Sequence, residues 1–66
     1  MNLTVNGEAR RLEGAPNVAA LVAVLGLDGR KVAVERNLEI VPRSAYEKTA
    51  LEDGDRIEIV HFIGGG

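Results

Sequence analysis

The chain has 66 residues, no cysteine and a formal net charge of −2, with 45% hydrophobic and 27% charged residues. A chain of this size buries only about 60% of its unfolded surface, which disfavours a self-contained enzyme with a deep pocket. The lack of thiols excludes disulfides and a cysteine nucleophile, and the scattered basic residues with only two aromatic residues disfavour nucleic-acid binding.

The same composition bears on location and partners. No apolar run approaches the roughly 20 residues that cross a membrane. Residues 1–5 lack the basic and apolar segments of a signal peptide. We therefore expect a cytoplasmic protein without a membrane partner, and the mild acidity suits a basic protein partner.

Residues 1–12 predict a β-hairpin. Leu3 and Val5 alternate with polar neighbours, which is typical of a half-buried strand. Asn6-Gly7 follows and suits a type I′ turn, in which both central residues take a positive φ. Residues 8–12 are then the returning strand.

One short helix is predicted after the hairpin. Asn17 can cap its start by accepting from main-chain N–H groups, and Gly26 suits the left-handed position after its end. Its apolar face consists of Val18, Leu21, Val22 and Leu25. With about two turns the helix is not stable alone, so it must lie on a sheet.

The second half of the chain predicts three strands. Residues 32–35 are β-branched and read as a central strand, and residues 36–39 as a turn. Residues 40–41 form a brief strand that Pro42 ends. The final strand covers residues 56–62.

Two irregular segments connect these strands. Residues 44–51 are irregular or contain one helical turn, and residues 53–55 form a tight turn. The order β-β-α-β-β-β predicts a two-layer α+β domain, with one helix packed across a mixed sheet of four or five strands. We expect the first and last strands to pair in the middle of the sheet, in parallel.

The last strand also predicts a protein interface. If Ile57 and Ile59 face the core, the period of two turns Glu58, Val60 and Phe62 outward. Exposed apolar patches mark protein interfaces, and here the partner-binding patch would be Val60, Phe62 and Ile63. The alternatives are a bulged strand end or a Phe62 folded back onto the core. His61 falls on the inward face, where we expect a structural role.

The charged residues predict no catalytic or metal site. The acidic residues around the last turn are Glu52, Asp53 and Asp55, and they lack the rest of a calcium loop. Four further residues read as solvated charges: Glu35, Arg36, Glu39 and Arg43. Arg43 is also a candidate to pair with an acidic protein. No nucleophile with its base is recognisable.

The last three residues are Gly64, Gly65 and Gly66. Glycines allow a chain to thread through a channel where a Cβ would clash, and they leave a terminal carboxylate unshielded. The alternative is a frayed end. We expect a domain of residues 1–63 followed by a flexible tail of residues 64–66.

These elements together resemble a known family. The matching stretches are residues 2–7, residues 34–43 with their Val-Pro-Arg, residues 51–59 with their Asp-Gly-Asp, and the glycine tail. At this spacing they resemble the ubiquitin-like sulfur carriers, which have the β-grasp fold, and most closely the ThiS family of thiamine biosynthesis. The resemblance covers the whole chain, although the family needs two terminal glycines and this chain has a third, Gly64.

The resemblance implies a carrier, not an enzyme. In the family, the adenylating enzyme ThiF uses ATP to activate the C-terminal carboxylate, here that of Gly66. A sulfur donor such as a cysteine desulfurase system converts the adenylate to a thiocarboxylate, which passes sulfur to the thiazole synthase ThiG. Gly64 and Gly65 would thread into the partners' active sites. We expect no resident cofactor or metal, and a monomer in isolation.

Two alternatives remain open from the sequence. One is a sibling carrier for molybdopterin synthesis, tRNA thiolation or cysteine synthesis. The molybdopterin carriers are usually longer, which favours thiamine. The other is a β-grasp interaction module without chemistry at its C-terminus.

Overall fold

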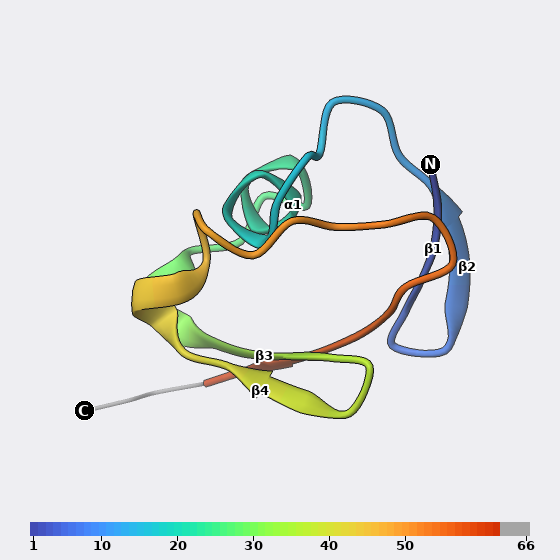
Figure 1. The fold of residues 1–66 in the computed structure, drawn as a ribbon. Coiled ribbons are helices and arrows are strands. Elements are labelled where there is room, and N and C mark those ends of the chain that lie inside the picture. Colours follow the sequence, from blue (N-terminus) through green and yellow to red (C-terminus); the bar gives the residue numbers. More distant parts are fainter. Residues whose placement is uncertain (63–66) are drawn as a thin grey trace.

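The structure is a computed structural model, and it describes residues 1–62. One mixed sheet of five strands lies in the order β2-β1-β5-β3-β4 (Figure 1). The strands are β1 (Asn2–Val5), β2 (Glu8–Arg11), β3 (Val32–Arg36), β4 (Glu39–Val41) and β5 (Arg56–His61). The helical segments are α1 (Val18–Val24) and two 3-10 turns, η1 (Gly29–Lys31) and η2 (Arg43–Ala45). The predicted mixed sheet with one helix is confirmed.

The first hairpin forms as predicted. β1 and β2 are antiparallel and join through Asn6 and Gly7, whose φ angles of 50° and 81° are those of a type I′ turn. The side-chain amide of Asn6 donates to the carbonyl of Ile59 at 3.1 Å and accepts from its N–H at 2.7 Å. This side chain therefore continues the contact between the hairpin and β5 beyond the end of β1.

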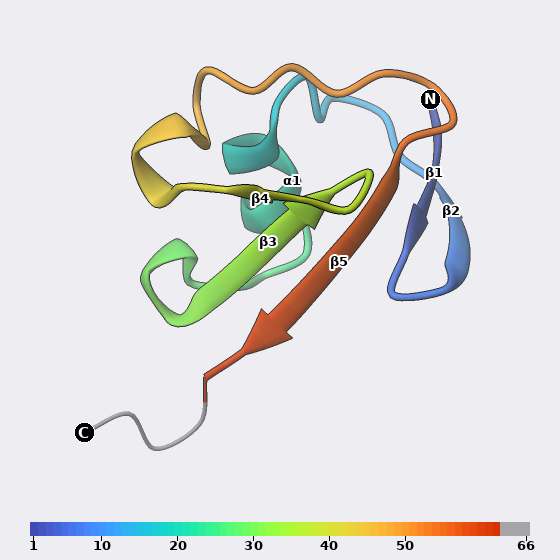
Figure 2. The same cartoon turned by 60° about the horizontal axis from the view of Figure 1, so that its bottom comes forward.

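The first and last strands lie side by side in the middle of the sheet. β1 and β5 are parallel, with Thr4 opposite Arg56 and Val5 opposite Ile57. β5 is antiparallel to β3 on its other side, and Figure 2 shows it crossing the centre of the domain. The prediction of a central parallel pair is confirmed.

The helix caps and the core also match the expectation. Asn17 accepts from the N–H of Ala20 at 2.8 Å, and Gly26 has a φ of 74°. α1 buries Val18, Leu21 and Val22 against one face of the sheet, while Leu25 is only partly buried at its end. The sheet contributes Leu3, Val5, Val32, Val34, Val41, Ile57 and Ile59 to the same core.

The hairpin of β3 and β4 is one residue longer on each strand than predicted. Its turn is Asn37 and Leu38, with φ angles of 52° and 71°. Because only these two residues turn, Arg36 and Glu39 remain paired across the ladder. The strand predicted to start at Ile40 therefore starts at Glu39, and β3 includes Arg36.

The connection from β4 to β5 lies against the start of α1, to which it is hydrogen-bonded. The sequence left open whether this connection is irregular or contains one helical turn. The structure has one turn, η2, which begins one residue before the predicted segment, at Arg43. Tyr46 is buried, and its hydroxyl donates to the carbonyl of Val32 at 3.1 Å. Main-chain hydrogen bonds link Thr49 to Val18 and Leu51 to Pro16, both at 3.0 Å. These bonds hold the irregular segment against the helix without a strand.

Candidate functional site

The candidate site begins where β5 leaves the sheet. The N–H of Phe62 donates to the carbonyl of Lys31 at 2.8 Å, so the pairing with β3 continues to Phe62 although the strand ends at His61. Figure 2 shows this end of β5 pointing away from the domain. The predicted site residues Ile63, Gly64, Gly65 and Gly66 and the predicted domain boundary lie outside the described residues.

The end of β5 presents apolar side chains on the sheet face opposite α1. Ile57 and Ile59 are buried beneath the helix, whereas Val60 and Phe62 are 60% and 50% exposed. The predicted alternation is therefore confirmed, and Phe62 is not folded back onto the core. Of the predicted partner-binding patch, Val60 and Phe62 are present on this surface.

The sequence reasoning missed a further part of this surface. Ile40 in β4 is 77% exposed and lies opposite Glu35, while its neighbour Val41 is buried opposite Val34. The available signal was the same alternation, since Val34 faces the core and Glu35 must then face outward with its cross-strand partner. Ile40 thus extends the exposed apolar surface from β5 across to the edge strand.

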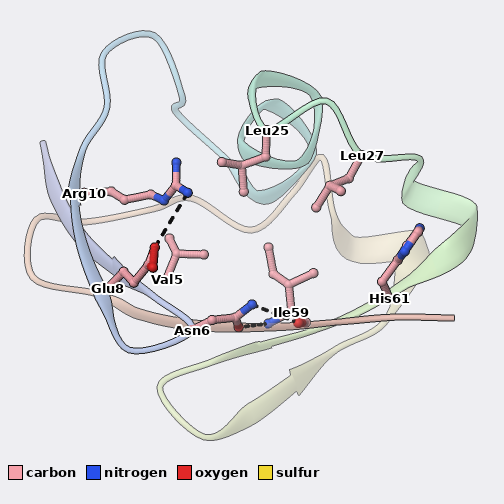
Figure 3. A pocket seen from close by; sticks show the side chains of 8 residues that line it. All are labelled: Val5, Asn6, Glu8, Arg10, Leu25, Leu27, Ile59 and His61. Carbon is pink, nitrogen blue, oxygen red and sulfur yellow. Dashed lines mark hydrogen bonds and ion pairs between the residues drawn. The ribbon is translucent and has the colours of Figure 1, made fainter.

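His61 is on the inward face, as predicted, but it is not covered there. It lies on the face that carries Ile59, but its side chain is exposed. The physical reason is the length of α1, which ends at Val24 and does not reach over the last residue of β5. His61 instead lines an open hollow of about 400 Å³ beside the helix end (Figure 3).

The hollow is not built as a catalytic pocket. Its wall combines the apolar Leu25 and Leu27 with two charged side chains of β2, as Figure 3 shows. These two, Glu8 and Arg10, lie 3.9 Å apart and partly neutralise each other. No nucleophile faces a base across this space, so the geometry favours no reaction there.

Arg36 is not the solvated charge that was predicted. Its Nε donates to Oδ2 of Asp55 at 2.8 Å, and Asp55 is only 5% exposed. Asp55 also accepts from the N–H of Glu52 at 2.8 Å and from the side-chain amide of Asn37 at 3.1 Å. Burial alone raises the pKa of Asp55, but the hydrogen bonds from Arg36, Glu52 and Asn37 outweigh it and hold this pKa below its ordinary value.

This network has a structural role. The predicted tight turn forms, with Gly54 at a φ of 89°, and Asp55 closes it through the N–H of Glu52. Asn37 additionally bonds both main-chain groups of Arg56, at 2.9 and 2.8 Å. The cluster therefore fastens the β3–β4 turn to the start of β5, at the end of that strand away from Phe62.

A second charged group lies near the other end of β5. The guanidinium of Arg43 donates to the main-chain carbonyl of Arg30 at 3.2 Å and is exposed. Arg30 in turn forms an ion pair with Asp28 at 3.0 Å, and its hydrogen bonds lower the pKa of Asp28 to about 2. Among residues 1–62, no cluster of three or more His, Cys, Asp or Glu residues is arranged to hold a metal ion.

Comparison with known proteins decides the family. The model of the ThiS family matches residues 3–66. The chain belongs to the ThiS family. It is 40% identical to the sulfur carrier protein ThiS of Bacillus subtilis, over 97% of this chain and 98% of that one. Its fold superposes on the crystal structure of the thiamine biosynthesis protein ThiS from Geobacter metallireducens with a TM-score of 0.83, at 42% identity over both whole chains.

Longer proteins contain the same region. A thiazole synthase from Paramagnetospirillum magneticum is 59% identical over the whole of this chain, and one from Magnetococcus marinus is 44% identical. The chain spans 20% of the length of each of these synthases. The resemblance inferred from the motifs is confirmed, and with it the ThiS β-grasp fold. No helix within the described part of the chain is long and apolar enough to cross a membrane.

Proposed function

We propose that this chain is a sulfur carrier for thiamine biosynthesis, which holds sulfur as a thiocarboxylate on Gly66. The observation that carries the proposal is the ThiS family match, which includes the glycine tail as well as the domain. The likeness to carriers of the same length supports it, since in them the match covers the whole protein. On this proposal the chain is a substrate of enzymes and not itself an enzyme.

The first chemical step makes the carboxylate reactive. A carboxylate is a poor electrophile, because its charge opposes attack by a nucleophile. An oxygen of the Gly66 carboxylate attacks the α-phosphorus of ATP, and pyrophosphate leaves. The product is a mixed anhydride with AMP. We assign this step to an adenylating enzyme, ThiF, which supplies the ATP site that so small a domain has no room to form.

The second step installs the sulfur. A donor such as a cysteine desulfurase system carries sulfur as a persulfide, and a thiol that attacks this persulfide releases hydrosulfide and leaves a disulfide. The hydrosulfide attacks the acyl carbon of the anhydride. The C–S bond forms, the C–O bond to AMP breaks, and AMP leaves with the electron pair. The chain needs no cysteine for this chemistry, and it has none. The resulting thiocarboxylate is the nucleophile that donates sulfur to thiazole synthase, ThiG.

The tail sets how far the carrier can reach. Gly66 lies four positions after Phe62 in the sequence, and an extended chain covers at most about 14 Å over that length. Gly64 and Gly65 have no side chains to obstruct a narrow channel. The reacting centre of each partner must therefore lie within about 14 Å of the place where Phe62 docks.

The thiamine pathway is preferred over the sibling pathways for one reason. Two of the relatives that match this whole chain are thiazole synthases about five times as long. A carrier region within the same polypeptide as a thiazole synthase supports ThiG as the acceptor of the sulfur. We further propose Val60, Phe62 and Ile63 as the docking patch for these partners, since they immediately precede the tail.

Intact-mass spectrometry tests the proposal. The 66-residue chain, prepared with Gly66 as its last residue, is incubated with the adenylating enzyme, ATP and sulfide. We expect a mass increase that corresponds to one oxygen replaced by sulfur, and no change in a variant that lacks Gly66. An unmodified wild type, with an enzyme that is active on another ThiS carrier, contradicts the proposal.

A further inference from the structure

The sheet face opposite α1 carries exposed apolar side chains on β4 and at the end of β5. Of the five large hydrophobic side chains that are exposed in residues 1–62, only Val24 belongs to the helix. The others are Leu38, Ile40, Val60 and Phe62, which lie in β4, in the β3–β4 turn, or at the end of β5. Figure 1 shows α1 on one side of β3 and β4, and no other element of residues 1–62 covers their opposite side. Exposed apolar side chains gathered on one face of a sheet are typical of a protein interface.

Two carboxylates lie within this apolar surface. Glu35 of β3 is directly opposite Glu58 of β5, and Ile40 lies on the other side of Glu35. The ladder bonds at Phe62–Lys31 and Asn37–Arg56 make Glu35 and Glu58 a hydrogen-bonded pair of the antiparallel ladder. Their Cβ atoms are therefore about 5 Å apart on one face, an arrangement in which like charges repel.

The positively charged residues in the described part of the chain neutralise these two carboxylates only in part. Arg56 approaches Glu58 at 3.7 Å, in an ion pair between side chains that are 61% and 38% exposed. Glu35 has no ion pair within 4.0 Å among the residues that the structure describes. The face therefore carries a net negative charge at its centre and apolar side chains around it.

The backbone conformation of Leu38 is a second observation that favours a binding role for this surface. It adopts a φ of 71°, a left-handed conformation that is unfavourable for a residue with a Cβ. Its side chain is 74% exposed, so packing within the domain does not compensate for the strain. Strained residues of this kind cluster where a function requires them.

The charge decides which occupant fits the face. A second copy of the chain, packed face to face about a two-fold axis, would bring Glu35 and Glu58 against the same two carboxylates. In such a dimer only Glu58 keeps a cation, its ion pair with Arg56, and burying the two Glu35 carboxylates without one is unfavourable. A partner protein with one arginine in an apolar surface avoids this cost, because its planar guanidinium can bond two carboxylates at once.

We propose that Glu35 and Glu58 receive one arginine of the enzyme on which the carrier docks, with Ile40, Val60 and Phe62 packed around it. This inference rests on the proposed carrier function, and it adds the charge chemistry of the docking face. The same pair keeps two carriers from associating through this face. It thus favours the enzyme over a second copy at this surface.

The test is the affinity for the adenylating enzyme. The dissociation constant is measured by calorimetry at low and high salt for wild type and for the double variant Glu35→Gln/Glu58→Gln. We expect about tenfold weaker binding at low salt and a smaller effect at high salt, because salt screens the lost interaction. The matched control is Glu8→Gln/Glu47→Gln, which removes the same charge from residues that line hollows on the helix side.

The outcomes separate the two proposals. If the Glu35→Gln/Glu58→Gln variant binds as tightly as the control, the arginine receptor is wrong. Thermal unfolding checks the fold, and we expect the variant to be at least as stable as wild type because the repulsion is gone. If a wild-type dimer forms and Ile40→Ser/Val60→Ser disperses it, a second copy is the occupant. The mass measurement on wild type decides the carrier function independently of these results.

Discussion

Removal of the Asp55 carboxylate should destabilise the domain more than any exposed charge change. In Asp55→Ala, the guanidinium of Arg36 loses its 2.8 Å partner, and the N–H of Glu52 and the amide of Asn37 lose their acceptor. Each hydrogen bond to a charged group contributes about 1.5–3 kcal/mol, and such contributions are not additive.

The expected magnitude follows from the exposure of the groups left behind. The Arg36 side chain is 27% exposed, so water replaces part of what it loses. We therefore expect Asp55→Ala to lower the free energy of unfolding by about 2–4 kcal/mol at pH 7. A domain of this size has a total stability of roughly 3–10 kcal/mol, so the variant loses a large share of it.

Urea unfolding followed by circular dichroism measures this loss, and Glu52→Ala is the matched control. Glu52 contacts the same guanidinium at 3.4 Å, but its side chain is 78% exposed. An exposed ion pair contributes about 0–1 kcal/mol. If the two variants lose the same free energy within error, or if Asp55→Ala loses less than about 1 kcal/mol, burial does not determine the strength of this network.

Three further predictions concern pH, docking and strain. Because the pKa of Asp55 is lower in the folded state than its ordinary value of 3.8, ionised Asp55 contributes fully to the free energy of unfolding above pH 3.8. This contribution is lost as the pH falls from 3.8 through the lowered pKa. The stability difference between wild type and Asp55→Asn in urea should therefore shrink from pH 7 to pH 3, and a constant difference would exclude this titration. Phe62→Asp should weaken binding to the adenylating enzyme in calorimetry, whereas Val24→Asp, an equally exposed apolar position on α1, should not; equal effects would argue against a docking patch. Leu38→Gly should raise the unfolding midpoint by relieving about 1 kcal/mol of left-handed strain while it weakens docking, and a lower midpoint would contradict the strain.

Local features of the sequence were sufficient to predict each strand and the α-helix, although not the 3-10 helix η1. The Asn6-Gly7 turn, the cap at Asn17 and the stop at Gly26 depend on the conformations that single residues prefer, and all three formed where expected. The exposure of Val60 and Phe62 followed from the alternation along one strand. The family also followed from short motifs at a characteristic spacing, and the comparison confirmed it.

Strand ends and charged side chains were less predictable. The β3–β4 hairpin gained a pair because the left-handed Asn37 and Leu38 shorten its turn, and no local signal showed that Leu38 would take that conformation. The alternation along β5 correctly predicted that His61 is on the inward face. It could not show whether α1 extends over His61, and α1 does not. Burial depends on what packs above a residue as well as on the direction in which it points.

The sequence by itself determined the elements, their order and the apolar face of each, because these depend on residues close together in the chain. Only the tertiary structure decided which charges meet. Arg36 and Asp55 are 19 residues apart, and Glu35 and Glu58 are neighbours only through the register of β3 against β5. The tertiary fold thus made one pair an ion pair within the domain and left the other as two adjacent carboxylates on the face proposed for docking. The physical reason is that charge interactions depend on distance in space, which the strand register sets and which separation along the chain does not reveal.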